Sequence, residues 1–328
     1  MRALLTIFVL AVLVTGGWLA WAWLTPVTPN GQTFVLLHPG YSSRKIAGEL
    51  KSAGVIRSAT AFELWHRIHG RRSLKAGEYL FEKTATSLEI HDRLMRGDVY
   101  VHTVVIPEGY NIFDIAQAIQ NAGLGSSQDF LAVATSDTAL IADLAPDAKT
   151  LEGYLFPSTY EFMRTQTMEE MAATMVKHFR QVAREIGLSS DVEQTVTLAS
   201  IIEKETAVPE ERPEVASVYY NRMEKRLPLQ ADPSVIYAEL LKGSYSGALH
   251  HADMEFQSSY NTYTHAGLPP GPIGSPGKSS LEAAMHPAHT DYFYFVSDGN
   301  SHHRFAHSLE EHNRNVAAYR RAVSSRTP

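Results

Sequence analysis

Two glutamates near the middle of the chain, Glu203 and Glu205, are the residues whose type and setting best suit acid chemistry. They lie in the stretch ASIIEKETAVPEER (199–212), where carboxylates and a lysine follow an apolar run. A carboxyl group beside apolar side chains can act as a general acid, because burial raises its pKa towards neutral pH. The stretch therefore poses a choice between a proton donor and a solvated helix end.

The helix expected over residues 190–206 allows only one of the two glutamates to enter a cleft. Residues two apart on a helix lie about 200° apart around its axis, so Glu203 and Glu205 point to different sides. Pro209 cannot extend the helix because it lacks an amide hydrogen, which places Glu205 in the last turn. There the helix dipole and apolar neighbours raise the pKa of a carboxyl group. The other glutamate and Lys204 are expected to face solvent or to serve a structural contact.

Polar side chains set among aromatic or apolar neighbours are candidates for contacts with a sugar chain. Saccharide-binding clefts combine the faces of aromatic rings with amide and carboxyl groups that hydrogen-bond the sugar. Structural roles compete with each assignment: a loop hydrogen bond for Glu152, core packing for the tyrosines, and a turn or N-cap for Asp232. The candidates are Glu152 in LEGYLFP (151–157), Gln230 and Asp232 in LPLQADPSVIY (227–237), and Tyr260, Asn261 and Tyr263 in YNTY (260–263).

Composition argues against several other classes of protein. The chain has 328 residues, enough for two or three domains with cores of their own, and its net charge of -6 gives no sign of a basic face for nucleic acid. It has no cysteine, so it can form neither a disulfide framework nor a thiolate metal site. Histidine pairs at 250–251 and 302–303 leave a zinc hydrolase as an alternative, although no His-Glu-x-x-His helix is present. We expect no metal or other cofactor.

The N-terminal segment is typical of a membrane anchor. Residues 3–24 carry no charge, and as a helix they span roughly 33 Å, close to the hydrocarbon thickness of a bilayer. Tryptophans gather at the far end of this run, where indole rings favour the membrane interface. Arg2 precedes the run and the next Lys or Arg is Arg44, which predicts a single-pass inner-membrane protein with a cytoplasmic N-terminus. A cleaved signal peptide is the alternative, but the run is longer than a usual apolar signal region.

The remainder of the chain is expected to be α+β. After a linker at 26–32, the order strand, glycine-containing turn and helix occurs near 34–55 and again at 101–121. We expect a strand at 34–37, a turn leading into a strand at 74–81, a strand at 101–106 and a buried strand at 292–296. Residues 260–277 are expected to form a loop. Further helices are predicted at 60–69, from Ser87 as a possible N-cap to Gly97, and at 129–144, 167–187, 190–206, 213–223 and 307–322.

The motifs, in this order and spacing, resemble the membrane-anchored endolytic murein transglycosylases, the YceG-like family. The resemblance implies a transmembrane anchor at 1–25, a linker at 26–32, a small LysM-like α+β domain at 33–100 and a larger mixed α/β catalytic domain at 101–328. The LysM-like part matches less specifically than the rest. The matching segments are LEGYLFP (151–157), ASIIEKET (199–206), ASVYYNR (216–222), LQADPSVIY (229–237), YNTY (260–263), GLPPGPI (267–273), YFYFV (292–296) and His312-Asn313.

The resemblance also implies an activity. Members of this family cleave the β-1,4 bond between N-acetylmuramic acid and N-acetylglucosamine in peptidoglycan without water, leaving 1,6-anhydromuramyl ends. The segment 202–206 is similar to the catalytic helix of lysozyme-like lytic transglycosylases, in which an acidic residue before Ser or Thr is catalytic. This assigns the catalytic role to Glu205, with Glu203 as the second candidate. The implied substrate-binding residues are Glu152, Gln230, Tyr260, Asn261 and Tyr263.

Expected partners follow from the same resemblance. They are the glycan strands of peptidoglycan and the membrane, with the cell-wall synthesis machinery as a further candidate and the ending of nascent strands as the expected role. A noncatalytic, membrane-anchored adaptor that binds glycan is the alternative function.

Overall fold

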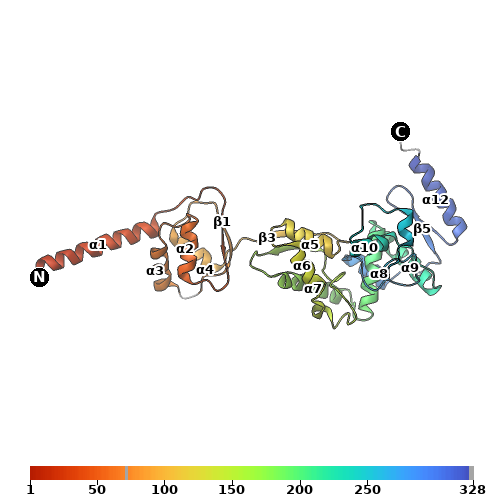
Figure 1. The fold of residues 1–328 in the computed structure, drawn as a ribbon, viewed down its shortest axis with the longest axis horizontal. Coiled ribbons are helices and arrows are strands. Elements are labelled where there is room, and N and C mark those ends of the chain that lie inside the picture. The colour runs from red at the N-terminus through yellow and green to blue at the C-terminus, as the bar shows by residue number, and fades with distance from the viewer. Residues whose placement is uncertain (71–72, 325–328) are drawn as a thin grey trace. The chain divides into compact units, whose positions relative to one another are not determined.

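The apolar run near the N-terminus forms one helix, α1 (Arg2–Leu24), in the computed structural model, which describes residues 1–70 and 73–324 (Figure 1). Within those residues, α1 is the single helix long and apolar enough to cross a membrane. Its last turn is packed against the protein: Trp23 Nε1 donates to the Ala61 carbonyl at 2.7 Å, and Ser87 Oγ donates to the Ala22 carbonyl at 3.0 Å. The predicted apolar helix is confirmed, while its orientation in a membrane stays a prediction.

The chain divides into two compact units. The first contains Met1–Thr103 and Glu161–Thr167, and the second contains Val104–Tyr160 and the residues from Met168 onward. The chain passes between the units three times: within the strands β3 (His102–Ile106) and β4 (Ser158–Phe162), and again just before Met168. β3 lies where the sequence predicts a strand, whereas β4 was not predicted; it follows the segment LEGYLFP (151–157), the aromatic loop. The whole is a mixed α/β protein.

The first unit follows the sequence prediction closely. Its strands pair antiparallel, with Thr33 opposite Phe81, and the core between strands and helices includes Leu37, Leu50 and Tyr79. After α1 its elements are β1 (Thr33–Leu37), α2 (Ser43–Ser52), α3 (Ala59–His69), β2 (Gly77–Phe81) and α4 (Ser87–Arg96).

The start of α4 differs from the prediction by one residue. Thr86, rather than Ser87, is the N-cap, because the Thr86 hydroxyl accepts from the Glu89 amide while the Glu89 carboxylate accepts from the Thr86 amide. This reciprocal pair satisfies two amide groups that the helix itself cannot. Ser87 is left to bind the end of α1. As predicted, α4 ends at Gly97, which adopts the left-handed conformation.

The second unit is mostly helical. Its two strands beyond β3 and β4 form an antiparallel hairpin with Tyr294 opposite Ala306. Its elements are α5 (Ile112–Asn121), α6 (Ser127–Ala134), the 3-10 helix η1 (Thr138–Ile141), α7 (Met168–Glu185), α8 (Val192–Glu205), η2 (Pro209–Glu211), α9 (Arg212–Glu224), α10 (Asp232–Lys242), η3 (His251–Glu255), α11 (Lys278–Met285), β5 (Tyr294–Ser297), β6 (His303–Ala306) and α12 (Leu309–Ser324).

Several elements of this unit depart from the sequence prediction. The helix predicted over 129–144 ends at Ala134, where the hydroxyls of Thr135 and Ser136 each hydrogen-bond a carbonyl four residues back, at 2.7 Å. Helices α10 and α11 were not predicted. The strand predicted over 292–296 starts at Tyr294, and its residues are partly exposed, so the prediction of a buried strand is wrong. The reason is that β5 pairs with β6 alone in a small hairpin.

Helix α8 is the centre of the second unit. It packs against α9, α10 and α11. Figure 1 shows α9 and α10 on either side of α8. Nearly every residue from Thr195 to Ile202 is buried, so α8 has no solvent-exposed stripe there. A helix that is buried on all sides is held by its neighbours along its whole length. The last turn of α8, which carries both glutamates, is therefore fixed in position.

Two loops that carry the family resemblance, 151–157 and 267–273, pack directly on α8. Gly153 has φ +84°, and a Cβ atom there would lie 2.5 Å from Pro272 Cβ and 2.9 Å from Val196 Cγ1. Only glycine permits that backbone conformation and that approach. The Ile273 amide donates to Ser200 Oγ at 3.0 Å, which ties the second loop to the same helix. Motifs far apart in the sequence thus meet on one helix.

Candidate active site

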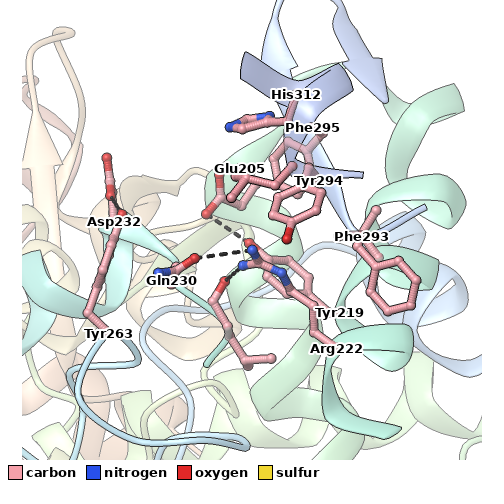
Figure 2. Close-up of a pocket in the computed structure, with 13 residues that line it drawn as sticks. Glu205, Tyr219, Arg222, Gln230, Asp232, Tyr263, Phe293, Tyr294, Phe295 and His312 are labelled. Atoms are coloured by element: carbon pink, nitrogen blue, oxygen red, sulfur yellow. Dashed lines mark hydrogen bonds between the residues drawn. The ribbon is translucent and has the colours of Figure 1, made fainter. Parts of the chain in front are cut away.

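Glu205 ends α8 and opens onto a pocket of about 300 Å³ (Figure 2). The helix stops here because Thr206 adopts an extended conformation, three residues before Pro209. Pro209, which the sequence suggested as the end of the helix, instead begins the short 3-10 turn η2. The pocket walls come from α9, from the segment leading into α10, from the YNTY loop, and from β5 and α12. All of these elements belong to the second unit.

The electrostatics around Glu205 suit a proton donor. Burial raises the pKa of the Glu205 carboxyl to about 7, the negative charge of Asp232 acts in the same direction, and a hydrogen bond from Tyr219 opposes both. Tyr219 donates its hydroxyl proton to Glu205 Oε1 at 2.9 Å. Part of Glu205 remains exposed in the pocket, so the group can reach a ligand. A carboxyl group that titrates near neutral pH can both donate and accept a proton there.

Glu203 lies in a different environment, as the helix geometry predicts. Its Oε1 pairs with Arg212 Nη2 at 2.8 Å, and both side chains are only 5% exposed. Its Oε2 accepts from the Gly277 amide at 2.9 Å, just before α11. Arg212 also donates to Ser279. Glu203 therefore joins α8 to α9 and α11 through fixed contacts.

Two of the predicted substrate-binding residues, Gln230 and Tyr263, line the pocket together with Glu205. Gln230 Oε1 accepts from Arg222 Nη2 at 3.1 Å, and the Gln230 backbone has φ +53°, an unusual value for a residue with a side chain. Tyr263 donates its hydroxyl proton to Asp232 at the start of α10. Figure 2 shows Gln230, Asp232 and Tyr263 on one side of the pocket.

Glu152 lies in the protein interior. Its Oε2 accepts from the Ile112 amide at 3.0 Å and from the Tyr237 hydroxyl at 2.8 Å, so it connects α5, the aromatic loop and α10. Burial raises the pKa of Glu152 to about 7, against the hydrogen bonds that it accepts. The ring of Tyr260 lies 5.1 Å from that of Tyr237, in the same cluster.

Asn261 is also in the interior. It is fully buried, and its amide group donates to the carbonyls of Met254 at 3.0 Å and Phe256 at 2.7 Å. These bonds close the loop between η3 and the pocket. The structure thus groups Gln230 and Tyr263 with Glu205. It places Glu152 and Asn261 in the interior, and Tyr260, which is partly exposed, beside Tyr237 and outside the residues that line the pocket.

Sequence reasoning did not single out four further residues of the pocket: Tyr219, Arg222, Tyr294 and His312. Tyr219 lies within the helix predicted at 213–223 and was given no role there, although its hydroxyl reaches Glu205. Tyr219 and Arg222 are three residues apart on α9 and so share one face, a spacing that could have linked them. All four lie within segments that carry the family resemblance, and polar or aromatic side chains inside those segments were the available signal.

One of the two histidine pairs that raised the zinc alternative, His302 and His303, has a carboxylate partner. Glu211 Oε1 lies 2.9 Å from His302 Nδ1, and Glu211 Oε2 lies 2.7 Å from His303 Nδ1. Although burial alone would raise it, the pKa of Glu211 is lowered by the hydrogen bonds from the two histidines and the His303 amide. Over residues 1–70 and 73–324, no three His, Asp or Glu side chains are grouped so that they can hold a metal ion.

The different settings of the two glutamates predict opposite effects on stability. Glu203→Gln should lower the free energy of unfolding by about 3 kcal/mol, because it leaves the buried Arg212 with only the more distant Glu108, 3.7 Å away. Glu205→Gln should leave stability unchanged or raise it slightly, since burial already disfavours the charge of Glu205. Urea unfolding of the full chain in detergent, above neutral pH, measures both. Equal losses would contradict this division of roles.

Known proteins resemble this chain in sequence and in fold. The profile of the YceG-like family matches residues 35–318. A Bacillus subtilis (strain 168) protein named endolytic murein transglycosylase is 34% identical over 320 residues, 90% of this chain and 88% of the relative. A Streptococcus pneumoniae serotype 2 protein of the same name is 29% identical over 351 residues, and that match covers 94% of this chain but 63% of the relative.

A solved structure agrees with the sequence matches. The crystal structure of a YceG-like protein from Listeria monocytogenes has a TM-score of 0.57 and 33% sequence identity to this chain, and the match covers 86% of this chain and 98% of that one. With the family profile extending over most of the described residues, the chain belongs to the YceG-like family.

Proposed function

We propose that this protein is a lytic transglycosylase that cleaves the glycan strands of peptidoglycan, with Glu205 as its acid and base. Its family and the name endolytic murein transglycosylase of its relatives support the activity. The observation that best supports this chemistry is the position of Glu205. Its carboxyl group lines an open pocket, and burial raises its pKa to about 7. The pocket has the size of a small-ligand site.

The proposed reaction uses one carboxyl group twice. Protonated Glu205 donates its proton to the glycosidic oxygen as the bond from that oxygen to C1 of the muramyl residue breaks. The C6 hydroxyl of the same residue attacks C1 and returns a proton to the Glu205 carboxylate. The products are a free N-acetylglucosaminyl hydroxyl and a 1,6-anhydromuramyl end, with no water consumed. This differs from glycosidases that use two carboxylates and water.

Neighbouring side chains support this role in different ways. Tyr219 holds the Glu205 carboxyl in position through its hydrogen bond, and the charge of Asp232 favours the protonated form. Gln230 and Tyr263 are the proposed sugar contacts, since they line the same pocket. For Glu152, Tyr260 and Asn261 we propose a supporting role, because their hydrogen-bond and ring contacts are to other parts of the protein.

The two parts of the chain outside the membrane are proposed to have separate tasks. Residues 33–100 form a LysM-like domain in this proposal, supported by the order strand, helix, helix, strand with antiparallel pairing of β1 and β2. Residues 101–328 form the catalytic domain in this proposal, and α8 corresponds to the catalytic helix of lysozyme-like enzymes. Its support is that the acidic residue before a threonine ends a buried helix at a pocket.

A location at the membrane, close to newly made glycan, suits the ending of nascent strands, and contact with the synthesis machinery belongs to the same proposal. The alternative is a noncatalytic adaptor that binds glycan. A binding protein has no need for a carboxyl group with a raised pKa, since burying that group without a charge partner costs stability. The setting of Glu205 therefore favours the enzyme.

The proposed topology places α1 across the inner membrane with the N-terminus in the cytoplasm, because Arg2 lies before the apolar run and no Lys or Arg follows until Arg44. Protease added to intact spheroplasts should degrade residues 101–328 and spare a tag fused to the N-terminus. Permeabilised cells, in which both are degraded, serve as the control. Loss of the tag with survival of the catalytic domain in intact spheroplasts would reverse the orientation.

Digestion of purified sacculi tests the reaction itself. The full chain should release fragments with 1,6-anhydromuramyl ends, identified by mass spectrometry, and Glu205→Gln should lower the rate by about 10²-fold or more because no acid remains. Replacement of the exposed Glu210 by glutamine is the matched control and should have no effect. Reducing ends would indicate a hydrolase, and intact glycan an adaptor. Activity that survives in Glu205→Gln would remove Glu205 from the mechanism.

The pH dependence provides an independent check on Glu205. Because only the protonated carboxyl can donate, kcat/KM should fall as the pH rises through about 7. Tyr219→Phe removes a hydrogen bond that lowers the pKa of Glu205, so it should move this fall to higher pH. Asp232→Asn removes a charge that raises the same pKa, so it should move the fall to lower pH. Shifts in the same direction for both variants would assign the titration to another group.

A further inference from the structure

Arg222 is a buried cation whose charge has no anionic partner in the described part of the chain. The residue is only 9% exposed. Its Nη1 donates to the Leu229 carbonyl at 2.7 Å and its Nη2 to Gln230 Oε1 at 3.1 Å, and both acceptors are neutral. Its Nε is buried with no hydrogen-bond partner, and among residues 1–70 and 73–324 no carboxylate lies within 4.0 Å of its guanidinium. A buried charge is costly unless it is paired.

The same molecule shows how such a cation is normally accommodated. Arg212, as deeply buried and on the same helix, pairs with Glu203 at 2.8 Å. Arg222 lines the Glu205 pocket, as Figure 2 shows, whereas Arg212 lies outside it. One buried arginine of α9 thus has its anion inside the protein, and the other faces a space that a ligand can enter.

The surroundings of Arg222 favour an anion from outside over one from the pocket walls. Glu205 is uncharged when it is ready to donate its proton, and Asp232 already accepts the Tyr263 hydroxyl. The Arg222 guanidinium lies 5.1 Å from the centre of the Tyr294 ring, which shields it from water on that side. The ring of His312 stacks on Tyr294 at 5.2 Å, and His312 Nδ1 is also buried without a partner.

We propose that Arg222 forms an anion subsite in this pocket that binds a carboxylate group of the glycan substrate, beside the bond that Glu205 cleaves. This inference rests on the proposed function. A muramyl residue differs from N-acetylglucosamine by a lactyl ether that ends in a carboxyl group. That group is free in glycan stripped of its peptides, whereas in peptide-bearing glycan it forms an amide and the peptide supplies the carboxylates. Either source offers the planar anion that a guanidinium recognises.

His312 reports on the charge of this subsite without taking part in the reaction. Burial lowers the pKa of His312, and the positive charge of Arg222 lowers it further. A carboxylate that binds to Arg222 neutralises that charge in the pocket. The pKa of His312 therefore rises when the subsite is filled, and a ligand without a carboxylate leaves it low.

Binding measurements with the full chain in detergent test the subsite. The chain carries Glu205→Gln so that the ligands are not consumed. The ligands are chitin oligosaccharides, which have no carboxylate, peptide-free glycan chains of similar length, and uncrosslinked peptide-bearing chains. We expect at least one carboxylate-bearing ligand to bind about tenfold more tightly than chitin oligosaccharide. Which of the two does so identifies the lactyl group or the peptide as the source.

Charge variants then assign the selectivity to Arg222. Arg222→Gln should remove the tenfold preference for the carboxylate-bearing ligand over chitin oligosaccharide. Replacing the exposed Lys225, three residues further along, by glutamine removes a nearby charge outside the pocket and should change neither affinity. An equal loss of affinity for all three ligands would show that Arg222 only supports the segment at Leu229 and Gln230, and would overturn the proposal.

A second measurement keeps the native arginine and so holds even if Arg222→Gln fails to fold. The His312 resonance, identified by its loss in His312→Gln, is titrated by NMR with each ligand. Its pKa should rise with the carboxylate-bearing ligand and stay unchanged with chitin oligosaccharide. No rise with any ligand would overturn the proposal. If the chain cleaves sacculi but shows no preference for a carboxylate-bearing ligand, the proposed enzymatic function stands and the anion subsite is overturned. If it shows the preference but does not cleave sacculi, the subsite stands and the enzymatic function is overturned.

Discussion

A carboxyl group fixed at the end of a helix that is buried on all sides is the constraint on which the site depends. The neighbours of α8 bury it from Thr195 to Ile202, so Glu205 is held at the edge of the pocket, and burial raises its pKa to about 7. Two residues earlier, the same helix directs Glu203 into an ion pair with Arg212. One helix thus places two glutamates in different environments. Glu203 is paired with an arginine, whereas Glu205 has a pKa close to neutral pH.

Charged side chains around the pocket fall into two groups, those with an ionic partner inside the protein and those without one. Glu203 and Arg212 neutralise each other where α8, α9 and α11 meet, and Glu211 serves the two histidines of the β5–β6 hairpin. Glu205 and Arg222 face the pocket without such partners. Their burial costs stability that a well-paired interior would not lose, a pattern expected where charges are held ready for a ligand.

Loops with little regular structure depend on the same helix. Gly153 lets the aromatic loop approach α8 as closely as Val196 and Pro272 allow, and Ser200 accepts a hydrogen bond from Ile273 of the second loop. Glu152, on the first of these loops, accepts from the Ile112 amide at the start of α5, and Asn261 donates to the carbonyls of Met254 and Phe256 beside η3. Many polar residues within the recognisable motifs therefore position the pocket without lining it.

The sequence alone determined what depends on near neighbours in the chain. The apolar run of α1, the strands and helices of the first unit and the separation of Glu203 from Glu205 all follow from periodicity within a few residues. Local patterns failed where side chains compete with the backbone, as Thr135 and Ser136 do at the end of α6, and where β5 has a single partner strand. Only the tertiary structure placed Tyr219, Arg222 and His312 around Glu205, because long-range packing brings α8, α9 and α12 together, and no spacing in the chain encodes which side chains meet there.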